Sequence, residues 1–360
     1  MNVRRPGRPF RRKNLFGAFI VPVLSLVTLA GRAPGAGYPR PQGGGGAVRV
    51  VPSDMDMCAA PARPGDAWDG FCLRGKVKAL TDELRAARVE GGRVEDGELI
   101  EIVKESFDGR GRRTLREMSS NHPGPVGAAF SKLVYSYDPS GRMTGWMSYE
   151  AGSTVPELVV VLSYDERGNR VRAEATGAKP GARYVQEFTY DAGGRLVGDS
   201  FSRLTDGGWQ THRQVVTFEG AVAHVRVYSP DGALASRGTT LSDGRGHLLG
   251  EEGYRVNAQG EEELDRKVTY RYDPKGRLTE VIYQRAEERL GARAVYEYDE
   301  SGNVTSLTRY NADGSFAASG HREYEYDAAG NWVRRVDSAR SSEGAAPAPY
   351  LVERRHITYY

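Results

Sequence analysis

The stretch VTYRYDPKGRLTEVIYQ, residues 268–284, decides how this chain folds. Two runs that alternate apolar and polar side chains flank the tetrapeptide from Asp273 to Gly276, and such alternation is typical of β-strands. Aspartate favours the first position of a type I turn and proline the second, while glycine at the fourth accepts a positive φ and forms a bulge. The stretch therefore predicts a β-hairpin whose first strand ends at Tyr272.

The same residue pattern recurs along the chain. An aromatic residue is followed by an acid at Phe107, Tyr137, Tyr164, Tyr190, Phe218, Tyr272, Tyr298 and Tyr326, mostly in steps of 26–30 residues. The gap after Phe218 is 54 residues, so we expect a degenerate repeat unit there, here called a worn unit, with Asp243 and Gly246 at its turn. The predicted structural residues of the well-preserved turns are Asp138 and Gly141, Asp165 and Gly168, Asp191 and Gly194, Asp273 and Gly276, Asp299 and Gly302, and Asp327 and Gly330.

Tyrosines two positions apart, such as Tyr270 and Tyr272, point to one face of a strand. A lone hairpin cannot fold, because ordering each residue costs roughly 1–2 kcal/mol and burying a large apolar side chain returns only about 1.5–3 kcal/mol. Neighbouring units must therefore share a sheet and stack their rings. We predict an all-β fold in which tandem antiparallel hairpins of about 27 residues form a long twisted or curled sheet over residues 100–360.

The N-terminus has a different composition. Residues 1–14 are basic and precede LFGAFIVPVLSLVTLA, an uncharged run from Leu15 to Ala30. A basic segment, a short apolar run and small residues are typical of a secretory signal, whereas a membrane-spanning helix needs about 20 apolar residues. We predict a signal peptide over residues 1–36, with an uncleaved anchor as the alternative. The protein is then secreted, periplasmic or on the cell surface, without a stable membrane span after cleavage.

The charge balance gives no support for nucleic-acid binding. Residues 1–36 carry seven basic residues and no acid, whereas the whole chain is formally +3, so the remainder is −4. A mildly acidic chain without a basic stripe lacks the electrostatic footprint of a nucleic-acid-binding protein.

Residues 37–57 are rich in glycine and proline and predict a flexible tether. Cys58 and Cys72 follow, and two nearby cysteines in an exported chain favour one disulfide, with two free thiols or a metal pair as alternatives. We assign residues 58–99 to an N-terminal cap with a worn first repeat. Residues 76–83 in this cap could begin an amphipathic helix, but they read better as a strand.

The pattern Tyr-Asp-x-x-Gly-Arg/Asn, followed by Leu or Val and Thr, resembles the YD repeats of Rhs (rearrangement hotspot) proteins over roughly residues 100–336. YDPKGRLT from Tyr272 and YDESGNVT from Tyr298 carry the resemblance best. CLRGKVKALTDE, from Cys72, is similar to a first unit that enters at Gly75, and VERRHITYY is similar to a last strand that stops where another Tyr-Asp would begin.

This resemblance implies hairpins wound into a spiralling sheet in an exported or surface-exposed bacterial protein. In large members of the family, dozens of repeats form a shell around a toxin, but this chain has few units and looks like a small stand-alone member. The resemblance also implies carbohydrate binding as a possible activity of the repeats.

Signatures of catalysis are absent from the sequence: there is no G-x-S-x-G, no H-E-x-x-H and no P-loop, and the six histidines lack metal-ligand spacing. The repeated aspartates could be read as the carboxylate pair of a glycosidase or as calcium ligands. An acid at the same position of nearly every repeat unit is explained more simply by its role in the turn. We therefore expect no catalytic residue, no cofactor and no metal.

Trp146, Trp209 and Trp332 lie in or near hairpins, where an aromatic ring could stack on a sugar, although they could equally fill a covered face. The preferred hypothesis is a non-enzymatic repeat protein that offers an extended β surface to a glycan or a surface protein. The alternatives are an accessory component of an Rhs-type toxin-delivery system and a glycan-active enzyme with an unrecognised site.

Overall fold

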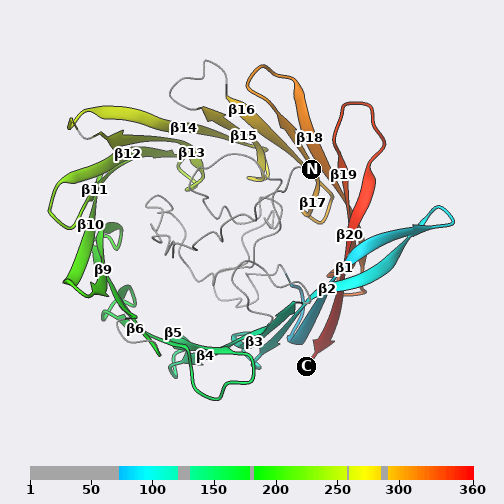
Figure 1. Ribbon diagram of the computed structural model, residues 1–360, viewed down its shortest axis with the longest axis horizontal. Helices are drawn as coiled ribbons and strands as arrows, with labels where there is room; N and C mark the ends of the chain where they lie inside the picture. Colours follow the sequence, from blue (N-terminus) through cyan, green and yellow to red (C-terminus); the bar gives the residue numbers. More distant parts are fainter. Residues whose placement is uncertain (1–72, 121–129, 179–181, 258, 285–290) are drawn as a thin grey trace, which may run out of the picture. The chain divides into compact units, whose positions relative to one another are not determined.

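The computed structural model describes residues 73–120, 130–178, 182–257, 259–284 and 291–360, which form twenty β-strands and no helix (Figure 1). The all-β prediction is confirmed. The strands are β1 (Val77–Glu90), β2 (Arg93–Phe107), β3 (Arg113–Ser120), β4 (Phe130–Tyr137), β5 (Met143–Glu150), β6 (Leu158–Tyr164), β7 (Arg170–Gly177), β8 (Arg183–Tyr190), β9 (Leu196–Thr205), β10 (Gly208–Glu219), β11 (Val222–Tyr228), β12 (Leu234–Ser242), β13 (Leu248–Val256), β14 (Glu262–Tyr272), β15 (Leu278–Gln284), β16 (Ala292–Tyr298), β17 (Val304–Tyr310), β18 (Phe316–Tyr326), β19 (Trp332–Arg340) and β20 (Ala348–Tyr359).

Each strand pairs antiparallel with the next along the chain, and the last strand pairs with the first. β20 pairs with β1 from Val77↔Tyr359 to Ala86↔Leu351, and β1 pairs in turn with β2. The strands of residues 73–360 therefore form a closed ring (Figure 1). The sequence predicted a twisted or curled sheet, and the structure shows that this sheet closes on itself.

Successive connections fall alternately at the two ends of the closed sheet, because neighbouring strands run in opposite directions. The Tyr-Asp turns all join an even-numbered strand to the next odd-numbered one, so they lie at one end, which we name the Tyr-Asp rim. The remaining connections lie at the other end, the loop rim. The expected worn unit has a complete turn at Asp243 and Gly246, whereas the unit at Phe218 turns tightly through Gly220.

Three further turns with the same backbone bonds lie at the loop rim, starting at Ser229, Asn257 and Asn311. The sequence search missed them because no aromatic–acid pair precedes them. Each has a glycine at the fourth position of the turn, which is the signal that could have revealed them.

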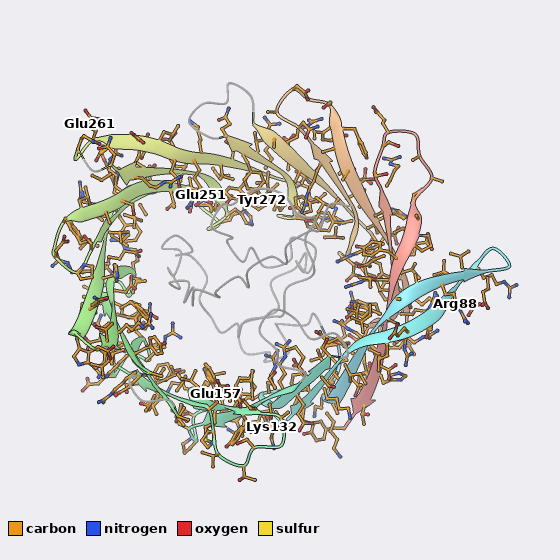
Figure 2. The ribbon with its side chains drawn as sticks, viewed as in Figure 1. Arg88, Lys132, Glu157, Glu251, Glu261 and Tyr272 are labelled. Atoms are coloured by element: carbon orange, nitrogen blue, oxygen red, sulfur yellow. The ribbon has the colours of Figure 1, made fainter. Side chains whose placement is uncertain are left out.

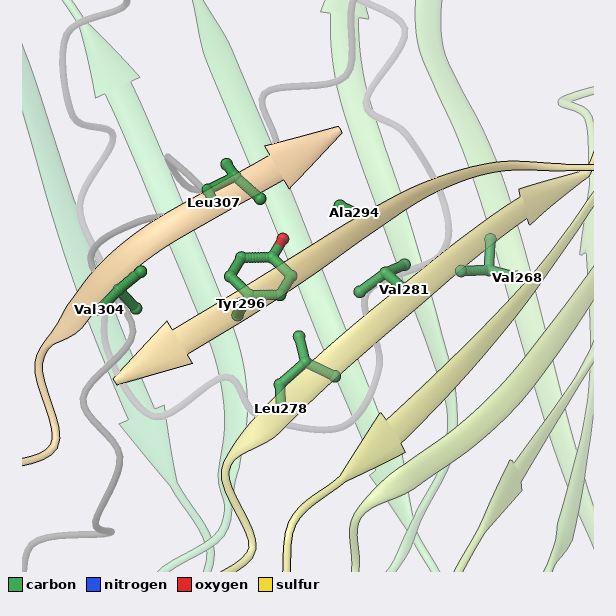
Figure 3. Close-up of a cluster of buried hydrophobic side chains, with 7 residues drawn as sticks. All are labelled: Val268, Leu278, Val281, Ala294, Tyr296, Val304 and Leu307. Atoms are coloured by element: carbon green, nitrogen blue, oxygen red, sulfur yellow. The ribbon is translucent and has the colours of Figure 1, made fainter. Parts of the chain in front are cut away.

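The sheet has two chemically different faces. Seven buried side chains on β14–β17 form its best-packed apolar cluster (Figure 3): Val268, Leu278, Val281, Ala294, Tyr296, Val304 and Leu307. Tyr270, Tyr272 and Tyr298 pack against this cluster, so we name this side the tyrosine face and the other side the opposite face. Figure 2 places Glu251 and Tyr272, both of the tyrosine face, along the inner side of the ring.

The ring closes through a repeat unit that is divided between β20 and β1. Gly75, with a φ of 83°, takes the place of the turn glycine, and Val77 and Leu80 follow it as Leu278 and Val281 follow Gly276. The Asn331 side chain donates to the Arg74 carbonyl at 2.8 Å, and the Tyr360 N–H donates to the Lys76 carbonyl at 2.9 Å. The two worn ends of the repeat array thus complete each other.

The strand interpretation of residues 76–83 is confirmed, because β1 begins at Val77. The predicted signal peptide, the tether and the pairing of Cys58 with Cys72 lie outside the described residues. Across the part of the chain that the structure describes, there is no helix long and apolar enough to cross a membrane.

Candidate functional site

The aspartate of each Tyr-Asp turn holds the turn together. After β14, the Asp273 N–H donates to the Arg277 carbonyl and the Gly276 N–H donates to the Asp273 carbonyl, both at 2.9 Å. One carboxylate oxygen of Asp273 accepts the N–H groups of Lys275 and Arg277, and the other accepts Nε of Arg277 at 2.6 Å. Gly276 has a φ of 80°, a value that favours glycine.

The other predicted turn residues lie in the same arrangement. Each turn glycine has a positive φ, and each aspartate accepts a backbone N–H four residues later. These pairs are Asp138 and Gly141, Asp165 and Gly168, Asp191 and Gly194, Asp299 and Gly302, and Asp327 and Gly330.

These carboxylates are committed to the turns. Hydrogen bonds from the backbone and side chain of Arg195 lower the pKa of Asp191, and the Asn169 side chain does the same for Asp165. Within the described ranges, no group of His, Cys, Asp and Glu is arranged to hold a metal ion. The repeated acids therefore act as ionised acceptors that fix the backbone.

In five units, the tyrosine before the turn aspartate links its unit to the one before it. The Tyr298 hydroxyl donates to the Leu278 carbonyl at 2.6 Å, two residues beyond the preceding turn glycine. The same bond joins Tyr137 to Arg113, at 2.7 Å. Burial raises the pKa of Tyr298 to about 12, so its hydroxyl keeps its proton at neutral pH. Equivalent bonds come from Tyr164, Tyr190 and Tyr272.

The arginine after the turn glycine completes this link. Arg277, held by Asp273, lies over the Tyr298 ring at 4.8 Å, and Arg112 lies over Tyr137 at 4.9 Å. A guanidinium over an aromatic face is attractive. Aspartate thus orients arginine, arginine covers the next tyrosine, and that tyrosine bonds back to the earlier unit.

The tyrosine face becomes ionic around the closure. Arg335 Nε lies 2.9 Å from Asp337 Oδ1, and its Nη2 lies 2.5 Å from Glu353 Oε2. Arg355 pairs with Asp82 across β20 and β1 at 3.0 Å. This seam cluster is completed by Arg322, Trp332, Glu105, Arg113 and Arg116.

Glu105 is the most buried carboxylate of the seam cluster, with 2% of its surface exposed. Its Oε2 lies 2.7 Å from Arg113 Nε, and its Oε1 lies 3.5 Å from Arg116 Nε. Burial outweighs both arginines and raises the pKa of Glu105 to about 7. Sequence reasoning missed this group. The signal that could have revealed it is an acid two residues before Phe107, at a position that the other units with an aromatic–acid pair fill with tyrosine or an apolar residue.

The three candidate tryptophans do not form one surface. Trp146 pairs with Tyr135 and lies on the tyrosine face, where Trp332 is also found, buried under Arg355 at 3.5 Å. Trp209 lies on the opposite face. Side chains alternate between the two faces along β10, and Gln210 and Gln214 belong to the tyrosine face. Only Trp209 among these three is exposed, with 47% of its surface accessible.

Trp209 stands on a hairpin that extends beyond the adjacent strands. Pairing of β8 with β9 begins at Arg203, and pairing of β10 with β11 begins at Arg213. Among the described strands, residues 204–205 and 208–212 therefore pair only with the other strand of their own hairpin. On the same side as Trp209, the hydroxyls of Ser202 and Thr211 lie 2.9 Å apart. The hairpin therefore presents one aromatic ring beside two hydroxyl groups.

No family model matches the chain, and no curated protein matches it either. Among solved structures, TcdB2-TccC3 without its hypervariable C-terminal region aligns at 15% identity and a TM-score of 0.26, covering 71% of this chain and 16% of that one. A porin-like protein from Bacteroides uniformis aligns at 10% identity and a TM-score of 0.34, covering 79% and 99%. A porin-like protein from Bacteroides vulgatus aligns at 11% identity and a TM-score of 0.31, covering 79% and 98%. The resemblance to Rhs repeats therefore stays a prediction from the sequence.

Proposed function

We propose that this protein is an exported, non-enzymatic scaffold that binds a glycan through the projecting β9–β10 hairpin. The observation that carries the proposal is the exposed ring of Trp209 beside the hydroxyls of Ser202 and Thr211. A sugar offers apolar C–H faces to an aromatic ring and hydroxyl groups to polar partners. Export rests on the basic and apolar N-terminal sequence.

The chemistry of the scaffold supports binding rather than catalysis. The repeated aspartates are occupied by turn hydrogen bonds, and the buried acids of the seam cluster are paired with arginines. Within the ring itself, closure also removes the two free edges that an open sheet would offer to a partner strand. A ligand of the ring is then expected on a face or at a projecting hairpin.

A glycan array, followed by calorimetric titration of any sugar that binds, tests this function. Trp209→Ala should weaken binding at least about tenfold, and Trp209→Phe should retain part of it. Leu241→Ala is the matched control, because Leu241 is an exposed apolar residue on the same face, and it should bind like the parent chain. An array without any binding, or a sugar that binds Trp209→Ala equally well, contradicts the proposal.

A further inference from the structure

The β1–β2 hairpin also extends past its neighbours. Pairing of β1 with β20 ends at Ala86↔Leu351, whereas pairing with β2 continues from Ala87↔Asp96 to Glu90↔Arg93. Residues 87–96 thus form a two-stranded arm, which leaves the ring (Figure 1) and carries Arg88 outward (Figure 2).

The arm is fixed to the opposite face of the ring at two points, Asp96 at its base and Val94 nearer its turn. Arg334 Nη2 donates to the Val94 carbonyl at 2.9 Å, and Arg354 forms an ion pair with Asp96. Gly97 allows the two strands to approach, because a Cβ there would come within 2.6 Å of the Ala86 carbonyl oxygen. The arm is therefore held in a defined direction.

The outer edge of β1 is available along this arm. Glu90 and Arg93 close a two-residue turn and form a hydrogen-bonded pair, so Ala87 and Val89 direct their N–H and C=O groups away from β2. No third strand pairs with residues 87–90 within the described ranges. Val89 is 57% exposed, and the side chains of Arg88 and Glu90 beside it form an ion pair with each other at 3.3 Å. A free strand edge is a template for another strand.

We propose that this arm joins two copies of the chain, edge to edge and antiparallel, about a two-fold axis at Val89. In that register Val89 faces Val89 of the second copy, Arg88 faces Glu90, and Glu90 faces Arg88. Every charge then meets its opposite on a neighbouring strand. This self-complementarity of Arg-Val-Glu is the reason that the partner is a second copy. The contact is small, so we expect a dissociation constant on the order of 0.1–1 mM.

Sedimentation velocity of the purified chain between about 10 µM and 1 mM tests the proposal. The parent chain should dimerise with concentration, and Glu90→Arg should raise the dissociation constant at least about tenfold, because it places arginine opposite arginine. Exchanging both cross-strand pairs of the arm, Arg88→Glu with Glu95→Arg and Glu90→Arg with Arg93→Glu, should restore dimerisation, because the charges then stay complementary between the copies and within the arm.

Glu300→Arg is the matched control for net charge, since Glu300 is exposed in a turn of the Tyr-Asp rim and should leave dimerisation unchanged. A chain that stays monomeric over the whole range overturns the proposal. A dimer that Glu90→Arg does not weaken, or that the fourfold exchange does not restore, also overturns it.

Discussion

Strands β14–β17 and the strands that meet at the closure carry different kinds of side chain at equivalent positions of the repeat, apolar in the first region and charged in the second. The fifth residue after the turn glycine is Val281 or Leu307 in the first region and Arg335 or Arg116 near the closure. The apolar cluster holds together by burial, whereas the seam cluster relies on paired charges. Because both regions keep the same hairpins, the turns and tyrosine links set the fold, and the face can vary.

The largest effect is expected when a charge enters the apolar cluster. Leu307 is 4% exposed and packs beside Tyr296. Gly320 lies opposite it on the next strand, and the charged residue two positions on is Arg322, which would repel an added arginine. Leu307→Arg should lower the free energy of unfolding by about 3–5 kcal/mol, because the guanidinium would be buried without a partner. Val161→Arg, at an exposed position on β6, should change it by less than about 0.5 kcal/mol. Equal losses in urea melts of the two variants would show that the cluster is not a core.

Breaking the seam cluster should cost almost as much. Arg335→Val removes an ion-pair partner of both Asp337 and Glu353, and we expect a loss of about 3 kcal/mol. Replacing Arg335 and Glu353 together by valine should recover most of that loss, since Asp337 keeps its ion pair with Arg322. Denaturant melts that show no recovery in the double variant would mean that the charges themselves are needed there.

The sequence predicted the hairpins better than it predicted this contrast. Asp273 and Gly276 belong to a local turn whose chemistry is complete within five residues, so sequence alone was sufficient to place it. Arg335 meets Glu353, and Arg355 meets Asp82, only because the ring closes. Closure depends on the summed twist of twenty strands, which no single repeat reveals. Trp332 and Trp209 had similar sequence surroundings, yet one is buried and the other exposed.

Glu105 gives the seam a pH dependence that the apolar cluster lacks. Its pKa is raised from 4.5 to about 7, so the folded state binds this proton more tightly than the unfolded state. The resulting stabilisation is complete below pH 4.5 and is lost as the pH rises through about 7. Glu105→Gln should remove a stability change on the order of 1–3 kcal/mol between pH 5 and pH 8. Parallel pH profiles for the parent and the variant in thermal melts would contradict this assignment.

The tyrosine link should have a smaller, local effect. Tyr298→Phe removes the hydroxyl that donates to the Leu278 carbonyl, and we expect a loss of about 1–2 kcal/mol. Tyr184→Phe is a matched control at a half-buried position of the same face, where the ring stacks on Phe201, and should change stability less. Urea denaturation of both variants makes the comparison, and equal losses would argue against the link between units.

Hydrogen exchange of the backbone amides across the closure tests the central claim most directly. If β20 pairs with β1, the amides of residues 80–84 and 353–357 should be protected as strongly as those of residues 278–282 in the apolar cluster. Exchange of both seam segments within seconds, while residues 278–282 stay protected, would mean that the sheet is open at this point.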